Sequence, residues 1–146
     1  MKGGDIGMPD LDETQQKKLE KKFQVDMKKV SKSDVEKVLE KAEPVLKKLR
    51  NSTVEKVLVM AKQATLVFEM LKSWWKGEIN LPWKTVAAMT VALLYLASPI
   101  DLLPDFFPLA GYIDDLFIVA VAMELVQDEL KDFAEMKGLD LKEYGF

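Results

Sequence analysis

The sequence predicts an all-α protein, a small bundle of about five helices built around a C-terminal helical hairpin with a connection rich in proline and aspartate. Apolar residues recur at helical spacing through most of the chain. No run of alternating β-branched residues is joined to hairpin turn residues, so we expect no sheet. Two strongly apolar segments, residues 86–97 and 116–123, flank the connection. We therefore expect these two segments to fold back on each other.

The composition fits a single domain and removes several kinds of chemistry. With 146 residues, of which 49% are apolar and 31% charged, the chain can bury a real core. It has no cysteine and no histidine. This excludes disulfides, thiolate catalysis, a Ser-His-Asp triad and metal sites that use cysteine or histidine. No recognisable catalytic constellation remains, so the sequence does not favour an enzyme.

The net charge of −3 hides an asymmetry between the two ends. Residues 10–50 carry twelve basic and nine acidic groups, whereas residues 101–146 carry three basic and eleven acidic groups. Because acids are interspersed with the basic groups, we expect no nucleic-acid partner. The N-terminus MKGGDIGMPD lacks the apolar stretch of a signal peptide. We expect a cytoplasmic protein, with peripheral or integral membrane attachment left open.

We expect four segments along the chain. Residues 1–10 contain three glycines and a proline and should form a flexible tail. Residues 11–32 should form a charged amphipathic helical extension. Residues 33–137 should form the main helical domain, and residues 138–146 should be a frayed C-terminus.

The extension is predicted from a thin apolar stripe at helical spacing. The stripe consists of Leu19, Phe23, Met27 and Val30, with lysines and acids between them. A stripe this thin buries little surface. We therefore expect the extension to be a peripheral helix that can detach.

Two helices should follow the extension. Ser33 and Ser52 each have a glutamate three residues later, which is the capping-box pattern of a helix start. Pro44 lies inside the first of these helices and predicts a kink there, or a division into two short helices. Gly77 should end the second helix.

The hairpin should come next. Its first helix should begin near Pro82, which suits a first-turn position. It should end at Ser98, because the residue before a proline is pushed out of the α conformation. The prolines of the connection prevent a long helix before residue 111. The second helix should therefore begin around Tyr112 and continue as one helix until Gly138 stops it.

The two apolar segments raise the question of a membrane hairpin. A spanning helix needs roughly 20 mainly apolar residues, but the segments supply only twelve residues (86–97) and eight residues (116–123). This length argument favours the buried core hairpin of a soluble bundle. Re-entrant or peripheral attachment, and double spanning, stay open as alternatives.

Four aspartates concentrate the polar chemistry of the connection: Asp101, Asp105, Asp114 and Asp115. If their carboxylates converge, they could bind Mg²⁺ or Ca²⁺, which prefer oxygen ligands, and a two-metal hydrolase would be the enzymatic extension. The simpler alternative explains each one separately. The first two would cap turns, and the last two would lie in the first turn of a helix, where its dipole favours acids. The sequence favours this alternative, with no catalytic residue and no cofactor.

Three tryptophans bracket the linker before the hairpin: Trp74, Trp75 and Trp83. The interpretation that the sequence favours is that they close one end of the core. The alternative is an exposed aromatic surface that faces a partner or a lipid headgroup layer.

The connection also carries a family resemblance. Tyr95, SPIDLLPD at residues 98–105, Pro108 and GYIDD at residues 111–115 are similar to the signature of the YkvA-like family, the domain of unknown function 1232. The preceding WWKGEINLPWKTVAAMTVALLYLAS resembles the family's lead-in, and the likeness covers roughly residues 35–135. The resemblance implies a small helical domain that is often membrane-associated. It implies no reaction.

Two functions from different classes follow. The first is a non-enzymatic interaction module or membrane-surface-associated module, with the amphipathic extension and the apolar hairpin as contact surfaces. Its partner would be an unknown protein or a membrane surface, and the oligomeric state is not fixed by the sequence. The second is a divalent-metal site made by the aspartates, with a regulatory or hydrolytic role.

Overall fold

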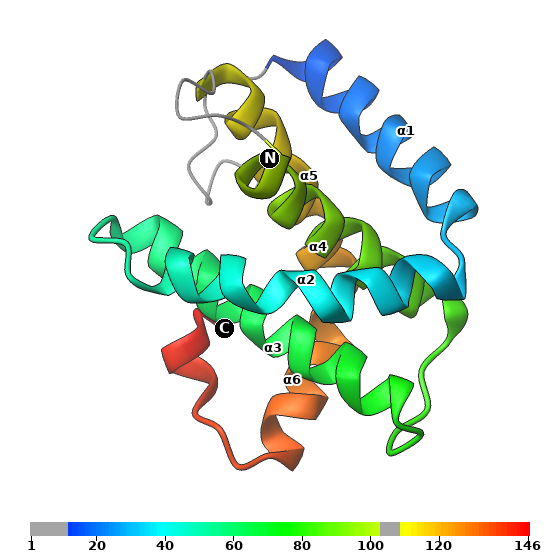
Figure 1. The fold of residues 1–146 in the computed structure, drawn as a ribbon. Helices are drawn as coiled ribbons and strands as arrows, with labels where there is room; N and C mark the ends of the chain where they lie inside the picture. The colour runs from blue at the N-terminus through cyan, green and yellow to red at the C-terminus, as the bar shows by residue number, and fades with distance from the viewer. Residues whose placement is uncertain (1–11, 103–108) are drawn as a thin grey trace.

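The computed structural model describes residues 12–102 and 109–146, with side-chain positions for all of these except Lys56, residues 97–102 and residues 109–116. The described chain contains six α-helices, one short 3₁₀ helix and no strand (Figure 1). The predicted all-α class is therefore confirmed. The elements are α1 (Glu13–Lys29), α2 (Lys32–Arg50), α3 (Glu55–Trp75), α4 (Trp83–Leu102), α5 (Leu109–Leu125), α6 (Gln127–Met136) and η2 (Leu141–Tyr144).

Helix α4 is the centre of the bundle. It contacts α1, α2, α3 and α5, and residues 85–93 are buried without interruption. A helix that is apolar on every side must be enclosed in this way. Its one buried polar residue in the apolar segment, Thr90, satisfies its hydroxyl by donating to the Val86 carbonyl at 2.8 Å.

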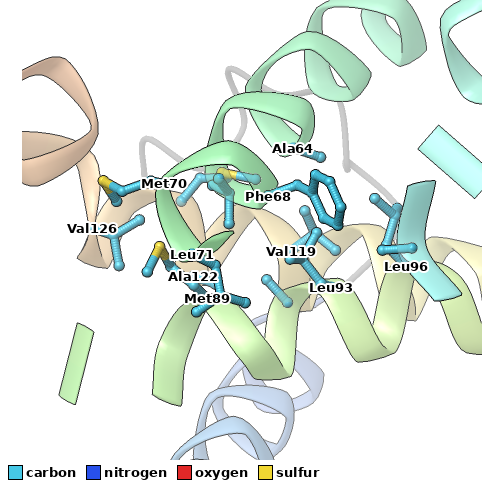
Figure 2. Packing of buried hydrophobic residues seen from close by; sticks show 14 of the residues in the cluster. Ala64, Phe68, Met70, Leu71, Met89, Leu93, Leu96, Val119, Ala122 and Val126 are labelled. Atoms are coloured by element: carbon cyan, nitrogen blue, oxygen red, sulfur yellow. The ribbon is translucent and has the colours of Figure 1, made fainter. Parts of the chain in front are cut away.

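The predicted hairpin is present, since α5 packs against α4. Figure 2 shows Met89 and Leu93 of α4 close to Val119 and Ala122 of α5, with Leu71 of α3 beside them. These residues belong to one continuous apolar core. Among the residues that the structure describes, no helix combines the length and the hydropathy that a bilayer crossing requires.

Helix α1 lies across the outer side of α4 and α5 (Figure 1). Asp12 caps it by accepting from the Gln15 backbone N–H at 2.8 Å, and the Gln15 side chain accepts from the Asp12 N–H at 3.1 Å. Phe23 is the one residue of α1 that is fully buried. Leu19 and Met27 pack against the core on either side of it.

The start of α2 differs from the prediction. The capping box is made by Ser31 and Asp34, two residues earlier than the predicted pair that begins at Ser33, and the Ser31 N–H donates to Asp34 Oδ2 at 2.9 Å. Pro44 does not divide the helix, which continues to Arg50. Pro44 itself is exposed, but Ala42, Val45 and Leu46 on the apolar face of the same turns are buried, and this packing offsets the backbone hydrogen bond that a proline removes.

The start of α3 also differs, because the helix begins at Glu55. The Ser52 hydroxyl accepts from the Val54 N–H at 3.0 Å, so this serine closes a local turn before the helix. The predicted stop at Gly77 is confirmed. Gly77 has φ +79°, and the N–H groups of Gly77 and Glu78 return to the carbonyls of the last turn at 3.0 and 2.9 Å.

The boundaries of the hairpin helices need three corrections. Helix α4 does not stop at Ser98 but continues to Leu102, since a following proline disfavours the α conformation without forbidding it. Helix α5 begins at Leu109 rather than around Tyr112. It ends at Leu125, so the predicted single long helix is two helices.

The break between α5 and α6 has a packing reason. Val126 leaves the helical conformation with φ −106° and ψ 12°. The chain then turns, and Leu130, Phe133 and Ala134 of α6 become buried, with α6 in contact with α3. An unbroken helix would carry this apolar face away from the core.

The C-terminus is packed against α3, whereas a frayed end was expected. It forms η2, and the Gln63 side chain donates from Nε2 to the Tyr144 carbonyl at 2.6 Å. Gly145 has φ +80°, and a Cβ built there would lie 2.8 Å from Val59 Cγ1. This contact leaves no room for a side chain at residue 145.

We expect Gly145→Ala to destabilise the C-terminal contact more than Gly138→Ala does. Both glycines have positive φ, so both changes carry the left-handed cost of about 1–2 kcal/mol. Only a Cβ at residue 145 also meets another residue, because nothing lies within 4 Å of one at residue 138. Denaturant unfolding of the two variants checks this, and equal losses of unfolding free energy would show that the contact with Val59 is relaxed at no cost.

Candidate functional site

The four predicted metal-binding aspartates lie at the edge of the described structure. Asp105 lies outside the described residues. The side chains of Asp101, Asp114 and Asp115 do so as well, although their backbones belong to α4 and α5. The metal hypothesis therefore stays a prediction, which a thermal-shift titration with Mg²⁺ and Ca²⁺ tests. Among the side chains that are described, no group of three acidic residues could hold a metal ion.

The backbone corrects one part of the simpler interpretation, the placement of Asp114 and Asp115. Helix α5 begins at Leu109, so Asp114 and Asp115 lie in its second turn, and the first turn contains no acidic residue. The prediction that Asp114 and Asp115 lie in the first turn of a helix is therefore wrong. Asp101 is next to the last residue of α4, and its predicted role as a turn cap stays a prediction because its side chain lies outside the described residues.

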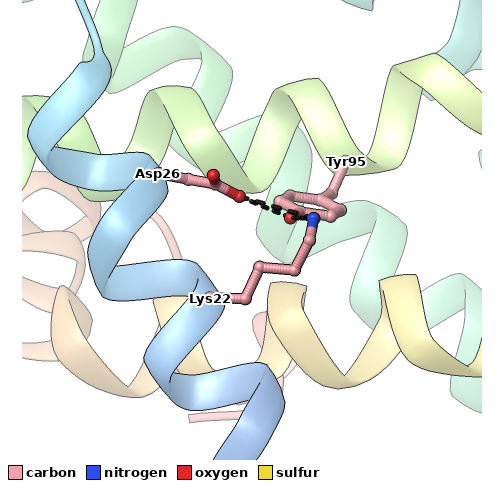
Figure 3. A network of polar contacts seen from close by, with 3 residues as sticks. All are labelled: Lys22, Asp26 and Tyr95. Atoms are coloured by element: carbon pink, nitrogen blue, oxygen red, sulfur yellow. Dashed lines mark hydrogen bonds and ion pairs between the residues drawn. The ribbon is translucent and has the colours of Figure 1, made fainter.

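A polar network joins α1 to α4 (Figure 3). The Tyr95 hydroxyl donates to Asp26 Oδ2 at 2.5 Å and accepts from Lys22 Nζ. Lys22 Nζ also lies 3.6 Å from Asp26 Oδ2 and 4.6 Å from the centre of the Tyr95 ring. Two charges one turn apart on α1 thus hold one phenol of α4. We call Lys22, Asp26 and Tyr95 the α1 latch.

The latch alters the acidity of two of its members. Burial raises the pKa of Tyr95, and the hydrogen bond to Asp26 raises it further. The hydrogen bond with Tyr95 raises the pKa of Lys22, although partial burial opposes this. The raised pKa of Tyr95 favours its neutral phenol, and the raised pKa of Lys22 favours its charged ammonium. These are the forms that the hydrogen bonds of the latch use.

We expect these pKa shifts to make the protein less stable in alkali. Both pKa values are raised by folding from ordinary values of 10.0 and 10.5, so the contribution is complete below about pH 10 and is lost as the pH rises through the folded-state values. Tyr95→Phe removes one titrating group and should flatten this dependence. Denaturant unfolding from about pH 9 to about pH 11 measures it. The same slope in both proteins would contradict a role of the latch tyrosine.

A groove of about 760 Å³ lies beside α1. Its lining comes from α1, from the first turns of α4 and from the last turns of α5. We call it the α1 groove. Helix α1 forms one wall, so the groove exists only while α1 is docked.

The three tryptophans form a cluster where α3 ends and α4 begins. The ring of Trp74 lies 6.5 Å from that of Trp75 and 6.0 Å from that of Trp83, with both pairs tilted by 56°. Trp74 packs against the core, whereas Trp75 and Trp83 are 42% and 43% exposed. Trp74 thus helps to close the core, as the favoured interpretation predicted, whereas Trp75 and Trp83 form an exposed aromatic surface, as the alternative required. We call these three residues the tryptophan corner.

The hairpin carries the similarity to known proteins. The family described as "Protein of unknown function (DUF1232)" matches residues 85–121, which include most of α4 and much of α5. A curated relative, the "Uncharacterized membrane protein YkvA" of Bacillus subtilis (strain 168), is 31% identical over 74 residues. The match covers 50% of this chain and 70% of the relative. The chain belongs to the YkvA-like DUF1232 family. No solved structure matches it.

The DUF1232 match includes only part of the α1 latch. Tyr95 lies inside the matched residues, whereas Lys22 and Asp26 lie on α1, outside them. The family segment thus supplies one side of the latch, and α1 supplies the other. The function of the family is uncharacterised, and the relative's name describes that protein as a membrane protein.

Sequence reasoning missed the latch and the groove. Tyr95 was noticed as the first residue of the DUF1232 signature, but its partners lie 69 and 73 positions away along the chain. The spacing of Lys22 and Asp26, four residues apart on a helix, is a visible sign of an ion pair. It contains no information about the tyrosine that joins them.

Proposed function

We propose that the protein is a non-enzymatic helical module that associates with a membrane surface through the tryptophan corner. The observation that carries this proposal is the exposure of Trp75 and Trp83 side by side with Trp74. An indole has a large apolar body and one polar N–H, and tryptophan is enriched where membranes meet water. The Bacillus relative is named as a membrane protein, which agrees with this proposal.

The proposal moves the contact surface away from the one that the sequence suggested. The apolar part of α4 is enclosed by other helices, and the apolar stripe of α1 packs on the hairpin. While the fold is closed, neither surface is exposed as a whole, and only the parts that line the α1 groove can be reached. Of the large apolar side chains that are described as exposed, Trp75 and Trp83 are the two that share an aromatic neighbour.

Basic residues accompany the corner. Lys76 directly follows Trp75, Lys84 directly follows Trp83, and both lysines are exposed. A lysine near an anionic leaflet contributes about 1 kcal/mol of attraction. We therefore expect the corner to prefer anionic over neutral vesicles, although Glu78 in the same linker reduces the preference.

The chain offers a direct test, because its three tryptophans are all in the corner. Its tryptophan emission therefore reports on the corner alone. We expect the emission to shift to the blue on addition of phosphatidylcholine vesicles that contain phosphatidylglycerol, and the protein to float with these vesicles. Unshifted emission, with all of the protein left in the aqueous fraction, would reject the proposal.

A double variant without the two exposed indoles tests whether the tryptophan corner is the membrane contact. Trp75→Ser with Trp83→Ser should lower vesicle partitioning on the order of 10-fold, since each change removes a half-exposed apolar side chain from the contact. The control is Val54→Ser with Met136→Ser, which removes exposed apolar surface elsewhere. Equal partitioning of the two double variants would mean that the corner is not the contact. A protein partner would then be the better explanation of its exposure.

A further inference from the structure

The α1 groove combines an apolar floor with a solvent-facing mouth. The accessible part of the floor is made by Met27 of α1 and by Val121 and Leu125 of α5, and the buried Phe23 of α1 and Ala87 of α4 complete it. Leu125 is 43% exposed, so the apolar surface continues to the mouth of the groove. A concave apolar lining in a volume of about 760 Å³ suits an apolar ligand group better than a small polar metabolite.

Four charged side chains share the lining with this floor. Lys28 and Lys84 are cations, and Glu20 and Glu124 are anions. Within the described residues the one ion pair is that of the α1 latch, so none of these four charges is paired with another. Among the described residues, these two positive and two negative groups therefore have no charged partner, and all four are exposed beside an apolar surface. Each can interact with a ligand group of the opposite sign.

This combination selects one class of ligand. A purely apolar molecule would leave all four charges unmatched. An anionic headgroup would match the lysines but face both glutamates. A phospholipid headgroup that carries a phosphate and an ammonium group matches both signs, and the acyl chain of the same lipid matches the floor.

We propose that the α1 groove binds one acyl chain of a zwitterionic phospholipid. Lys28 and Lys84 hold the phosphate, and Glu20 and Glu124 face the positively charged ammonium group. The position of the groove supports this ligand, because Lys84 directly follows Trp83 of the tryptophan corner. In this respect the inference rests on the proposed function, since the membrane that the corner touches is the source of the lipid.

Binding of the lipid is tested on the full chain without vesicles. The probe is lysophosphatidylcholine below its critical micelle concentration, and the readout is the NMR signal of isotope-labelled methionine methyl groups. We expect the Met27 methyl to shift and saturate, while the Met136 methyl, on a residue 61% exposed on α6, stays unchanged. A static Met27 signal would overturn the inference. So would parallel, unsaturated shifts of both methyls, which are the mark of non-specific amphiphile binding.

Two further lipids with the same acyl chain test the headgroup. Lysophosphatidic acid lacks the ammonium group, and a monoacylglycerol lacks both charges. We expect each to bind on the order of 10-fold more weakly than lysophosphatidylcholine. If either one binds as tightly, the charges of the lining do not select a zwitterion and the inference fails.

A charge-reversal variant tests the residues. Lys28→Glu with Lys84→Glu should weaken lysophosphatidylcholine binding on the order of 10-fold, because it turns the two phosphate partners into repelling groups. The control is Lys29→Glu, a change in the same last turn of α1 at a residue that does not line the groove. An unchanged signal from the buried Met89 methyl shows that the variants are folded. Equal affinities of the variant and the control would overturn the inference.

The two proposals can fail separately. Vesicle binding without binding of the monomeric lipid rejects the groove and keeps the corner. Binding of the monomeric lipid without vesicle binding rejects the corner as a membrane contact and keeps the groove. The corner variant, Trp75→Ser with Trp83→Ser, should leave the Met27 titration unchanged, since neither residue lines the groove.

Discussion

Phe23→Ala is expected to release α1 from the hairpin while the rest of the bundle stays folded. Phe23 is 1% exposed and is the one fully buried residue of α1. Truncating a buried phenylalanine costs about 3–5 kcal/mol. A free helix of 17 residues is marginal in water, so α1 should unfold once it is undocked.

Native-state hydrogen exchange measures this release. The amides of α1 should lose their protection, whereas those of α3 and α4 should keep it. The control is Val25→Ala on the same helix, where the side chain is 43% exposed and should contribute little. If all helices lost protection together, α1 would be an integral part of the cooperative fold. If none did, Phe23 would not be what holds α1.

The same variant links the fold to both proposals. Release of α1 removes one wall of the α1 groove, so lysophosphatidylcholine should no longer shift the Met27 methyl. The tryptophan corner is formed by α3 and α4, and its vesicle binding should persist. The latch makes a smaller contribution to the same docking, because the Lys22 side chain is exposed to water and that of Asp26 is partly exposed.

The sequence was most informative where the pattern of burial is simplest. Residues 86–97 carry no charge, which is why a buried helix in the hairpin could be predicted, and residues 85–93 are indeed enclosed. Gly77 and Gly138 were predicted as helix stops, and both adopt positive φ where a helix ends. In each case the residue type alone nearly fixes the local structure.

Helix starts were harder to predict, because the capping pattern is degenerate. Ser31 and Ser33 both have an acid three residues later, and a pattern of serine and acid does not say which serine is the cap. The predicted start of the second hairpin helix was three residues late, at Tyr112 instead of Leu109. Because of this error, Asp114 and Asp115 were predicted in the first turn of the helix, although they lie in the second. The predicted interaction of both aspartates with the helix dipole depended on that placement.

The candidate sites depend on contacts that sequence patterns do not encode. The latch and the groove exist because α1 lies across two helices far away along the chain. Their side chains, such as Lys28 and Glu124, look like ordinary surface charges in the sequence. Only docking of α1 brings them to one apolar groove. By contrast, the tryptophan corner lies within ten residues, so its two alternatives could already be stated from the sequence.

The central position of α4 predicts a large and specific loss of stability for Leu93→Ala. Leu93 is 1% exposed, and Figure 2 shows it within the packed core beside Val119 of α5. Truncation of a buried leucine costs about 2–5 kcal/mol, from the lost transfer free energy and the cavity that remains. Native domains are stable by only about 5–15 kcal/mol, so the variant should melt roughly 10 °C lower.

Leu94→Ala provides the matched control for this effect. Leu94 is the next residue of the same helix and is only partly buried, so the same chemical change should cost clearly less. Thermal and denaturant unfolding of the two variants would measure the difference in stability. Because α4 contacts four other helices, Leu93→Ala should lower the stability of the whole bundle, and all helices should unfold in one transition. Similar small losses would mean that residues 86–97 do not form the interior of the bundle. The apolar segment would then be free to serve as a contact surface, and the case for the tryptophan corner as the membrane contact would lose its physical basis.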